Sequence, residues 1–256
     1  MELLIAIVAF VASLLTLFSG FGLGTILLPV FGLFFPINMA IALTGVVHLL
    51  NNLFKTGLVG KHADRQTLLK FGVPAIIGGF FGAILLGYLS GLPSLFDWRM
   101  GEKEISITPI KFVIGLLLLF FAIYDLIPKL KNLSFPEKYL PIGGILSGFF
   151  GGLSGMQGAI RSAFLINAGL KKEQFIATGV IIACLVDLTR LPMYFRNFME
   201  NQLTDQWELL LIATLSAFLG AYIGAKFIQK ITIKTVQSIT AIMILVIAIL
   251  LMIGVL

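Results

Sequence analysis

The sequence contains few polar residues that could do chemistry, and the most informative one lies inside an apolar run. Arg161 is found six residues beyond Gly155 in an otherwise apolar segment. A charge at membrane depth costs at least about 2.5–3.5 kcal/mol, so a ligand or partner has to offset it. Because the guanidinium is a planar fork of donors matched to oxyanions, Arg161 predicts an anion site. The alternatives are an ion pair with Asp187 or Asp125, or snorkelling to the cytoplasmic face.

Two glycine-rich motifs interrupt the longest apolar runs. Ser19-Gly20-Phe21-Gly22-Leu23-Gly24 breaks residues 3–35, and Gly151-Gly152-Leu153-Ser154-Gly155-Met156-Gln157-Gly158 breaks residues 139–170. Unwound backbone at membrane depth needs protein or a water-filled cavity to satisfy its amides, and the helix starts that follow, near Thr25 and Ala159, suit an anion. The alternative is that the glycines only allow close helix packing. The substrate-binding residues predicted from the breaks are Gly20, Gly22, Gly24, Thr25, Gly155, Gln157 and Gly158.

A further group of polar residues lies on the apolar segment 37–59. His48 falls about 16 Å along this helix at about 1.5 Å per residue, close to the membrane centre. Thr44 precedes it by one turn, and Asn51 and Asn52 follow on the same face. Thr44, His48 and Asn52 are therefore added to the predicted substrate site. His48 fits a donor to an anion or a carrier of a coupling proton, and it equally fits a buried structural histidine.

Asp187 and Arg190 share one helix face at i,i+3 spacing, and Cys184 lies on it too. We assign this pair to coupling or to an ion pair, and for Asp187 an interhelical ion pair near the outer side is favoured. Cys184 is the only cysteine, so no disulfide or CxxC pair forms, and it is expected to be a small packing residue. No HExxH, GxSxG or Walker A motif is present. The sequence therefore predicts no enzyme activity, no cofactor and no metal site.

The composition identifies the elements that must position these residues. Apolar residues make up 59% of the 256 residues and charged residues 12%, with a mean hydropathy of +1.05. Soluble domains have roughly 45–50% apolar and about 25% charged residues, so the chain is predicted to be an all-α polytopic membrane protein. A soluble enzyme, a nucleic-acid-binding module and a disordered chain are excluded. The N-terminal segment, with Glu2 in place of a cationic region, is expected to be retained.

The apolar runs predict the number of helices. Unbroken runs of about 20 residues, long enough to span a membrane, fall near 37–59, 68–91, 110–127, 174–194, 206–226 and 235–256. With the two broken runs, hydropathy gives about eight spans. About 32 residues of continuous helix would reach about 48 Å, which exceeds the hydrocarbon core, so each broken run is expected to form two short helices. The total is then about ten helices.

The two halves of the chain resemble each other. Ser19-Gly20 aligns with Ser154-Gly155, and Thr44-Gly45-Val46 aligns with Thr178-Gly179-Val180. We predict one integrated membrane domain made of repeat A (1–130), a cytoplasmic linker (131–136) and repeat B (137–256). Each repeat has one glycine-broken helix pair and three transmembrane helices.

The basic residues predict how the halves are oriented. Twelve of the 18 cluster in alternate connections, which the positive-inside rule places in the cytoplasm. If each broken run enters and leaves on one side, each half makes an odd number of crossings and the second half is inverted. The alternative is eight plain spans with parallel halves. The twelve are Lys55, Lys61, Arg65, Lys70, Lys129, Lys131, Lys138, Lys171, Lys172, Lys226, Lys230 and Lys234, whereas Arg99, Lys103, Lys111, Arg190 and Arg196 are assigned to the outer connections.

The motifs resemble those of the TauE/SafE-type sulfite exporter family, also called the toluenesulfonate-uptake permease family. The likeness rests on the run from Ser19 to Pro29 with Thr44-Gly45, and on Gly152 to Ala159 with Ala177-Thr178-Gly179. The second copy lacks the proline and carries Gln157 and Arg161 instead. The resemblance implies a multi-pass permease of the inner cell membrane for small organic or sulfur-containing anions such as sulfite or sulfonates.

The expected partners and mechanism follow from this resemblance. A small anionic substrate and the lipid bilayer are the expected partners, nucleic acid is not, and a homodimer is left open. Alternating access between two inverted repeats is the expected mechanism. A membrane-embedded enzyme, a passive anion channel and a structural or receptor-like subunit remain the alternatives.

Overall fold

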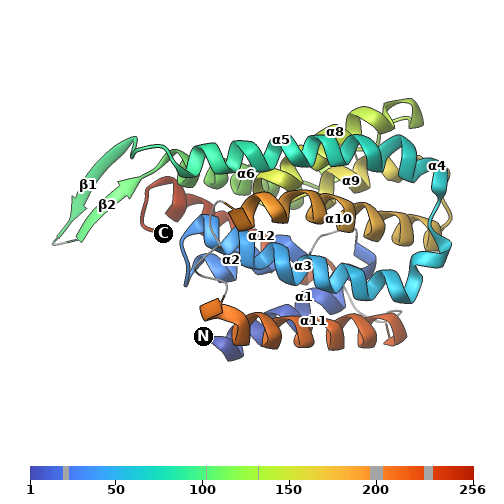
Figure 1. Ribbon diagram of the computed structural model, residues 1–256, viewed down its shortest axis with the longest axis horizontal. Helices are drawn as coiled ribbons and strands as arrows, with labels where there is room; N and C mark the ends of the chain where they lie inside the picture. The colour runs from blue at the N-terminus through green and yellow to red at the C-terminus, as the bar shows by residue number, and fades with distance from the viewer. Residues whose placement is uncertain (20–22, 102, 132, 197–203, 228–232) are drawn as a thin grey trace.

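The computed structural model is a bundle of helices lying side by side along one axis, with a β-hairpin projecting from one end (Figure 1). The structure describes residues 1–19, 23–101, 103–131, 133–196, 204–227 and 233–256. The elements are α1 (Glu2–Ser19), α2 (Leu23–Gly32), α3 (Ile37–Val59), η1 (Gly60–His62), α4 (Arg65–Thr67), η2 (Leu68–Gly72), α5 (Val73–Ser90), β1 (Phe96–Met100), β2 (Lys103–Ile107), α6 (Pro109–Leu126), α7 (Pro128–Lys131), η3 (Glu137–Tyr139), α8 (Leu140–Ser154), α9 (Gly158–Leu165), α10 (Lys172–Tyr194), η5 (Thr204–Gln206), α11 (Trp207–Phe227) and α12 (Ile233–Met252).

The helices confirm the predicted all-α polytopic membrane fold. Among the described residues, the stretches long and apolar enough to cross a membrane are Ile37–His62, Arg65–Ser90, Lys172–Tyr194 and Trp207–Lys226. Shorter apolar helices cover Glu2–Thr16, Leu23–Gly32, Pro109–Tyr124 and Ala241–Met252. The chain is therefore a multi-pass membrane protein.

Both long apolar runs divide into two helices, as expected. In the second half α8 ends at Ser154, and Gly155 follows with φ of 80°, in the left-handed region that favours glycine. Helix α9 then starts at Gly158. In the first half α1 ends at Ser19 and α2 begins at Leu23, and the predicted site residues Gly20 and Gly22 lie outside the described residues.

One connection at the end of the bundle has structure that was not predicted. Residues 96–107 form an antiparallel hairpin in which Trp98 pairs with Ile105, and the Trp98 indole N–H donates to the carbonyl oxygen of Ile253 at 3.0 Å. At the opposite end, Asp64 caps α4 by accepting the backbone N–H of Thr67 at 2.7 Å. The hydrogen bonds from Thr67 lower the pKa of Asp64 below its usual value.

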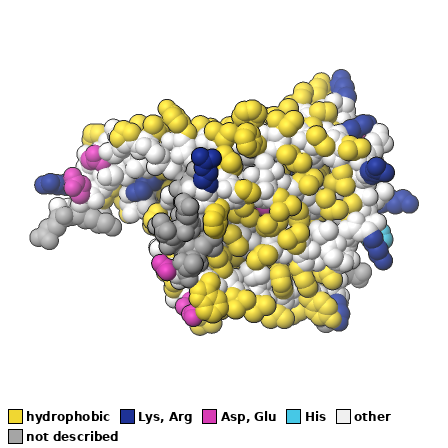
Figure 2. Space-filling model, in the orientation of Figure 1, with side chains coloured by type: hydrophobic (Ala, Val, Ile, Leu, Met, Phe, Trp, Pro, Cys, Tyr) yellow, Lys and Arg dark blue, Asp and Glu magenta, His cyan; other side chains and the backbone are white. Residues whose placement is uncertain are grey.

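The surface charges separate along the bundle axis. On the face seen in Figure 2, most of the visible Lys and Arg side chains gather at the end that carries η1 and α4, and an apolar band covers the middle. The acidic side chains that stand out on this face lie at the other end, by the hairpin and the start of α11 (Figure 2). We call the end formed by η1, α4, η3 and the first turn of α10 the basic end. The positive-inside rule places it in the cytoplasm.

Glycines let the main helix pairs pack backbone to backbone. A Cβ on Gly78 or Gly82 of α5 would clash with carbonyl oxygens of α8, and one on Gly148 would clash with the carbonyl oxygen of Ala75. A Cβ on Gly220 of α11 would likewise clash with the carbonyl oxygen of Phe10 in α1. These glycines away from the two breaks therefore serve close helix packing.

The helix pairs join the two halves of the chain in a reciprocal way. Helix α5 packs along α8 and α11 along α1, while α3 packs on α10 and α6 on α12. If α1–α6 and α8–α12 are equivalent units, each of these four contacts has its counterpart under exchange of the units. The repeat boundaries and the inversion remain predictions.

The glycine packing generates a first test. Gly148→Ala places a methyl group against the backbone of α5, so we expect overpacking to lower the free energy of unfolding by about 1–3 kcal/mol. The corresponding fall in Tm, measured in detergent, is roughly 2–10 °C. Gly57→Ala is the matched control, because nothing lies within 4 Å of its new Cβ. Equal melting of both variants would contradict the close contact between α5 and α8.

Candidate functional site

The buried charges of the described chain concentrate in one region between α3, α9 and α10. The charged side chains buried there are Lys55, Arg161, Asp187 and Arg190. Asp187 attracts Arg161 as well as Arg190, and Lys55 and Arg161 lie close enough to repel each other. Within the described residues, Arg161 and Arg190 therefore share one buried carboxylate, with the Lys55 side chain nearby. Such an imbalance in a low-dielectric interior favours the binding of an anion.

Asp187 is the centre of a buried hydrogen-bond network. Its Oδ2 lies 2.6 Å from His48 Nδ1, and its Oδ1 accepts from Arg190 Nε at 2.8 Å and pairs with Arg190 Nη2 at 2.8 Å. Asp187 therefore has one contact within its own helix and one with another helix, and its predicted position near the outer side stays a prediction. Asp187 and Arg190 pair within α10 because residues at i,i+3 share a face. The contact that joins two helices is the one from Asp187 to His48 of α3.

The ring of His48 contacts Asp187 of α10 and Asn52 of its own helix. Asn52 Nδ2 lies 3.2 Å from His48 Nε2, so the amide can donate to this nitrogen while Nδ1–H donates to Asp187. The hydroxyl oxygen of Thr56, one turn further along α3, lies 3.7 Å from the sulfur of Cys184. Cys184 is buried against this face, as expected for a packing residue. The structure confirms that the side chains of His48 and Asn52 lie side by side, as predicted.

Arg190 ties α10 to the second glycine break. Its Nη1 lies 3.4 Å from the hydroxyl of Tyr194, which donates in turn to the carbonyl oxygen of Gly152. A Cβ on Gly155 would lie 2.9 Å from Arg190 Nη1, and one on Gly45 would lie 3.3 Å from its Nη2. Glycine at both positions therefore leaves room for the guanidinium. Assigning Arg190 to an outer connection was wrong, because its side chain is completely buried inside α10.

Arg161, by contrast, has unused hydrogen-bonding capacity. The side chain is only 9% exposed, which contradicts snorkelling, and its Nη1 has no partner among the described residues. It forms no ion pair with Asp187, although the two attract each other, and the side chain of Asp125 lies outside the described residues. The guanidinium lies beside Gly179 of α10, whose Cβ would sit 3.4 Å from Arg161 Nε. A buried donor in this state is available to a ligand.

Gln157 lies at the start of α9 with both polar side-chain atoms buried and unpartnered. Its side chain is 1% exposed, and neither Oε1 nor Nε2 has a partner among the described residues. Its backbone is held, because its carbonyl oxygen accepts from Ser147 Oγ at 3.2 Å and from the Arg161 N–H at 3.0 Å. An unsatisfied buried polar group costs about 1–3 kcal/mol, so its presence calls for a ligand or water.

The two glycine-broken segments meet next to this network. A Cβ on Gly24 of α2 would lie 3.3 Å from the carbonyl oxygen of Gly155, 3.6 Å from Thr44 and 3.9 Å from the His48 ring. Thr44 is buried with an unpartnered hydroxyl, and Thr25 is buried too. The helix starts of α2 and α9 therefore approach the same region. Gly158 is buried there as the first residue of α9.

Two site residues were missed by the sequence analysis. Lys55, counted among the cytoplasmic connections, is 3% exposed inside α3. With the Asn51 amide nitrogen turned toward Ser13 and the carbonyl oxygen of Ala217, its oxygen accepts from Lys55 Nζ at 3.1 Å. The signal in the sequence is spacing, because Asn51 and Lys55 follow His48 by three and seven residues on one helical face. No spacing pattern in the sequence pointed to Tyr194 as part of the site.

The comparisons with known proteins identify a family. A family model described as Sulfite exporter TauE/SafE matches residues 5–251 of the 256. Comparison with curated proteins and with solved structures gave no significant match. Within the described residues, no group of three or more His, Cys, Asp or Glu side chains gathers to hold a metal ion.

The Asp187 network generates a second test. Asp187→Asn leaves Arg190 buried without its counter-charge, and we expect a loss of about 3–5 kcal/mol in the free energy of unfolding. Arg190→Gln should lower the free energy of unfolding by a similar amount, because it leaves the Asp187 carboxylate without the charge of Arg190. The double variant should cost less than the sum of the two by about 0.5–3 kcal/mol. Unfolding in detergent measures all four proteins, and Asp205→Asn, at an exposed acid, is the control. Additive losses would contradict a direct pair.

Proposed function

The chain belongs to the sulfite exporter TauE/SafE family of membrane transporters, and from the site just described we propose that it moves small oxyanions such as sulfite or sulfonates. The binding position proposed is the region where Gly24, Gly155 and the N-terminus of α9 approach each other. Arg161 and Gln157 bind the oxyanion directly, and backbone N–H groups at the helix starts complete the contacts. No catalytic step is part of the proposal.

The observation that carries this proposal is the set of buried, unpartnered polar atoms. Arg161 Nη1, both side-chain atoms of Gln157 and Thr44 Oγ1 have no partner among the described residues. A guanidinium, an amide nitrogen and a hydroxyl all donate to oxyanions, so one small ligand satisfies them together. Packing alone gives no reason to leave these atoms unsatisfied in one region.

The charge balance supports a negative ligand over a neutral one. Among the described residues, Arg161 and Arg190 share the one buried carboxylate of Asp187, and Asp187 is already paired with Arg190 and His48. An incoming oxyanion supplies the counter-charge that Arg161 lacks. Fixed donors that keep their positions need little reorganisation when the anion enters.

The proposed mechanism is alternating access between two inverted repeats. The reciprocal packing of α5 on α8 and of α11 on α1 supports two units that move against each other. Helices α2 and α9 are too short to cross a membrane, and Gly24 of α2 approaches Gly155, three residues before α9, inside the bundle. An inside-negative potential drives a monovalent anion outward by about 2.3 kcal/mol per 100 mV, so export needs no coupling ion.

Arg161 provides the direct test of the site. Arg161→Gln removes the positive charge, and we expect saturable sulfite flux in proteoliposomes to fall at least about 100-fold, as for a charged hydrogen bond worth about 3 kcal/mol. Arg65→Gln is the control, because Arg65 is an exposed cation at the basic end. Full flux in Arg161→Gln with normal membrane insertion would remove Arg161 from the site. Flux that never saturates would indicate a channel instead.

Substitutions of Gln157 test substrate binding and protein stability separately. Gln157→Leu removes two unsatisfied polar atoms, so we expect the substrate-free protein to become more stable by about 1 kcal/mol or more. The same change should raise the KM for sulfite about tenfold, because a donor to the anion is lost. Gln157→Glu adds a negative charge and should abolish flux. Unchanged KM in Gln157→Leu would contradict a contact between this side chain and the substrate.

A further inference from the structure

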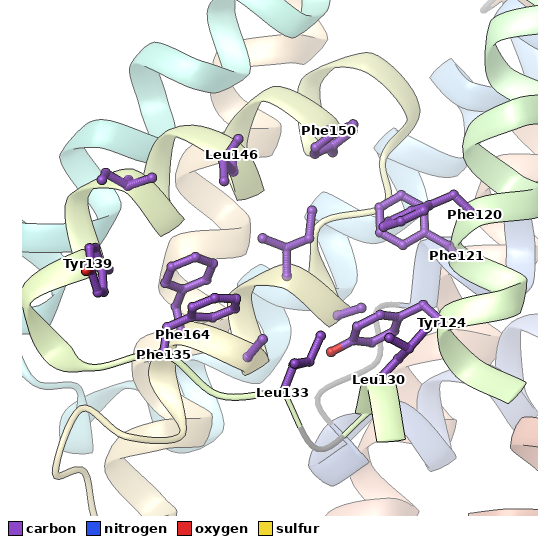
Figure 3. A pocket seen from close by; sticks show the side chains of 14 residues that line it. Phe120, Phe121, Tyr124, Leu130, Leu133, Phe135, Tyr139, Leu146, Phe150 and Phe164 are labelled. Carbon is purple, nitrogen blue, oxygen red and sulfur yellow. The ribbon is translucent and has the colours of Figure 1, made fainter. Parts of the chain in front are cut away.

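An apolar pocket lies on the other side of α9, away from the polar site. Its volume is about 750 Å³, within the roughly 300–1,000 Å³ typical of small-molecule sites. Figure 3 shows Phe120 and Phe121 of α6 on one side, Phe150 of α8 above, and the stacked rings of Phe135 and Phe164 opposite. None of the residues proposed to bind the oxyanion lines it.

The polar site and the apolar pocket lie against different faces of helix α9. Ile160 and Ala163 line the apolar pocket, whereas Arg161 lies beside Gly179 of α10. A small oxyanion gains nothing from walls of hydrocarbon and aromatic rings. The pocket therefore suits a ligand with a long apolar part.

The position of the pocket favours a ligand from the bilayer. Several lining side chains are exposed on the surface of the bundle, among them Phe120, Ile142 and Leu146. In a membrane protein these side chains contact lipid, so the pocket is open to acyl chains without passage through water. Leu130 and Tyr139 line opposite sides of the pocket, and Tyr139 belongs to the basic end (Figure 3).

Two lysines, each next to a residue that lines the pocket, favour a negatively charged headgroup. Lys129 is exposed next to Leu130, and Lys138 lies with its Nζ 5.0 Å from the ring centroid of Tyr139. Lys70, close by, is already paired with Glu137 at 2.9 Å, whereas Lys129 and Lys138 form no ion pair within the described part of the chain. Cations beside the membrane surface attract anionic lipid headgroups.

We propose that this pocket binds one acyl chain of an anionic phospholipid from the leaflet at the basic end, with the headgroup contacting Lys129 and Lys138. The acyl chain fills the space between α6, α8 and α9. None of the residues proposed to bind the oxyanion is part of this site.

The test measures lipid retained by the full-length purified protein in native mass spectrometry, with phosphatidylglycerol and phosphatidylcholine as probes. Leu146→Trp fills the pocket, and we expect about a tenfold loss of phosphatidylglycerol binding, equivalent to excluding roughly two methylene groups. Ile145→Trp is the matched control, since Ile145 is similarly exposed on α8 (47% against 41%) but does not line the pocket.

The headgroup contact is tested with the same measurement. Replacing both Lys129 and Lys138 by Gln should reduce the preference for phosphatidylglycerol over phosphatidylcholine about tenfold. Lys226→Gln is the control, because Lys226 makes a similar contact with the ring of Tyr222, 4.5 Å from its centroid, and no residue of α11 lines the pocket. Equal retention in Leu146→Trp and Ile145→Trp would overturn the proposal. A change in oligomeric state in place of lipid loss would also overturn it, since the pocket would then bind protein.

Discussion

Burying a charge in a low-dielectric interior costs free energy, and this cost determines which side chains pair between α3 and α10. Asp187 is stabilised there by Arg190 on its own helix and by His48 of α3, and the contact with His48 is lost if α3 and α10 separate. The His48–Asp187 hydrogen bond thus helps to set the position of α3 relative to α10. Charges that this network leaves unmatched, above all Arg161, are the ones able to attract a ligand.

Glycine packing makes this network possible. Because α5 and α8 touch through their backbones, the carbonyl oxygen of Gly152 is held where the Tyr194 hydroxyl can donate to it. Gly155 and Gly45 leave the space that the Arg190 guanidinium occupies. The small residues therefore have two functions in this fold, and the second, making room for a buried cation, is specific to the site.

Helix α9 connects the two binding positions proposed for this protein. Its first turn and Arg161 belong to the polar region, while Ile160, Ala163 and Phe164 form a wall of the apolar pocket. A short helix that contacts an oxyanion on one face and a lipid chain on the other can respond to both. Any movement of α9 would then change the two sites together.

The sequence by itself determined the membrane fold, the helix positions and the two breaks, because apolar length and glycine content are local properties. It also identified Arg161, Gln157, His48 and Asp187, since a polar residue in an apolar run has to be explained. Only the tertiary structure decided which of these are paired. Asp187 binds His48 from more than a hundred residues away, Nη1 of Arg161 has no partner in the described part of the chain, and Lys55 is buried although its position near a helix end suggested a connection. Pairing depends on distances between helices, and those distances follow from the packing of the whole bundle.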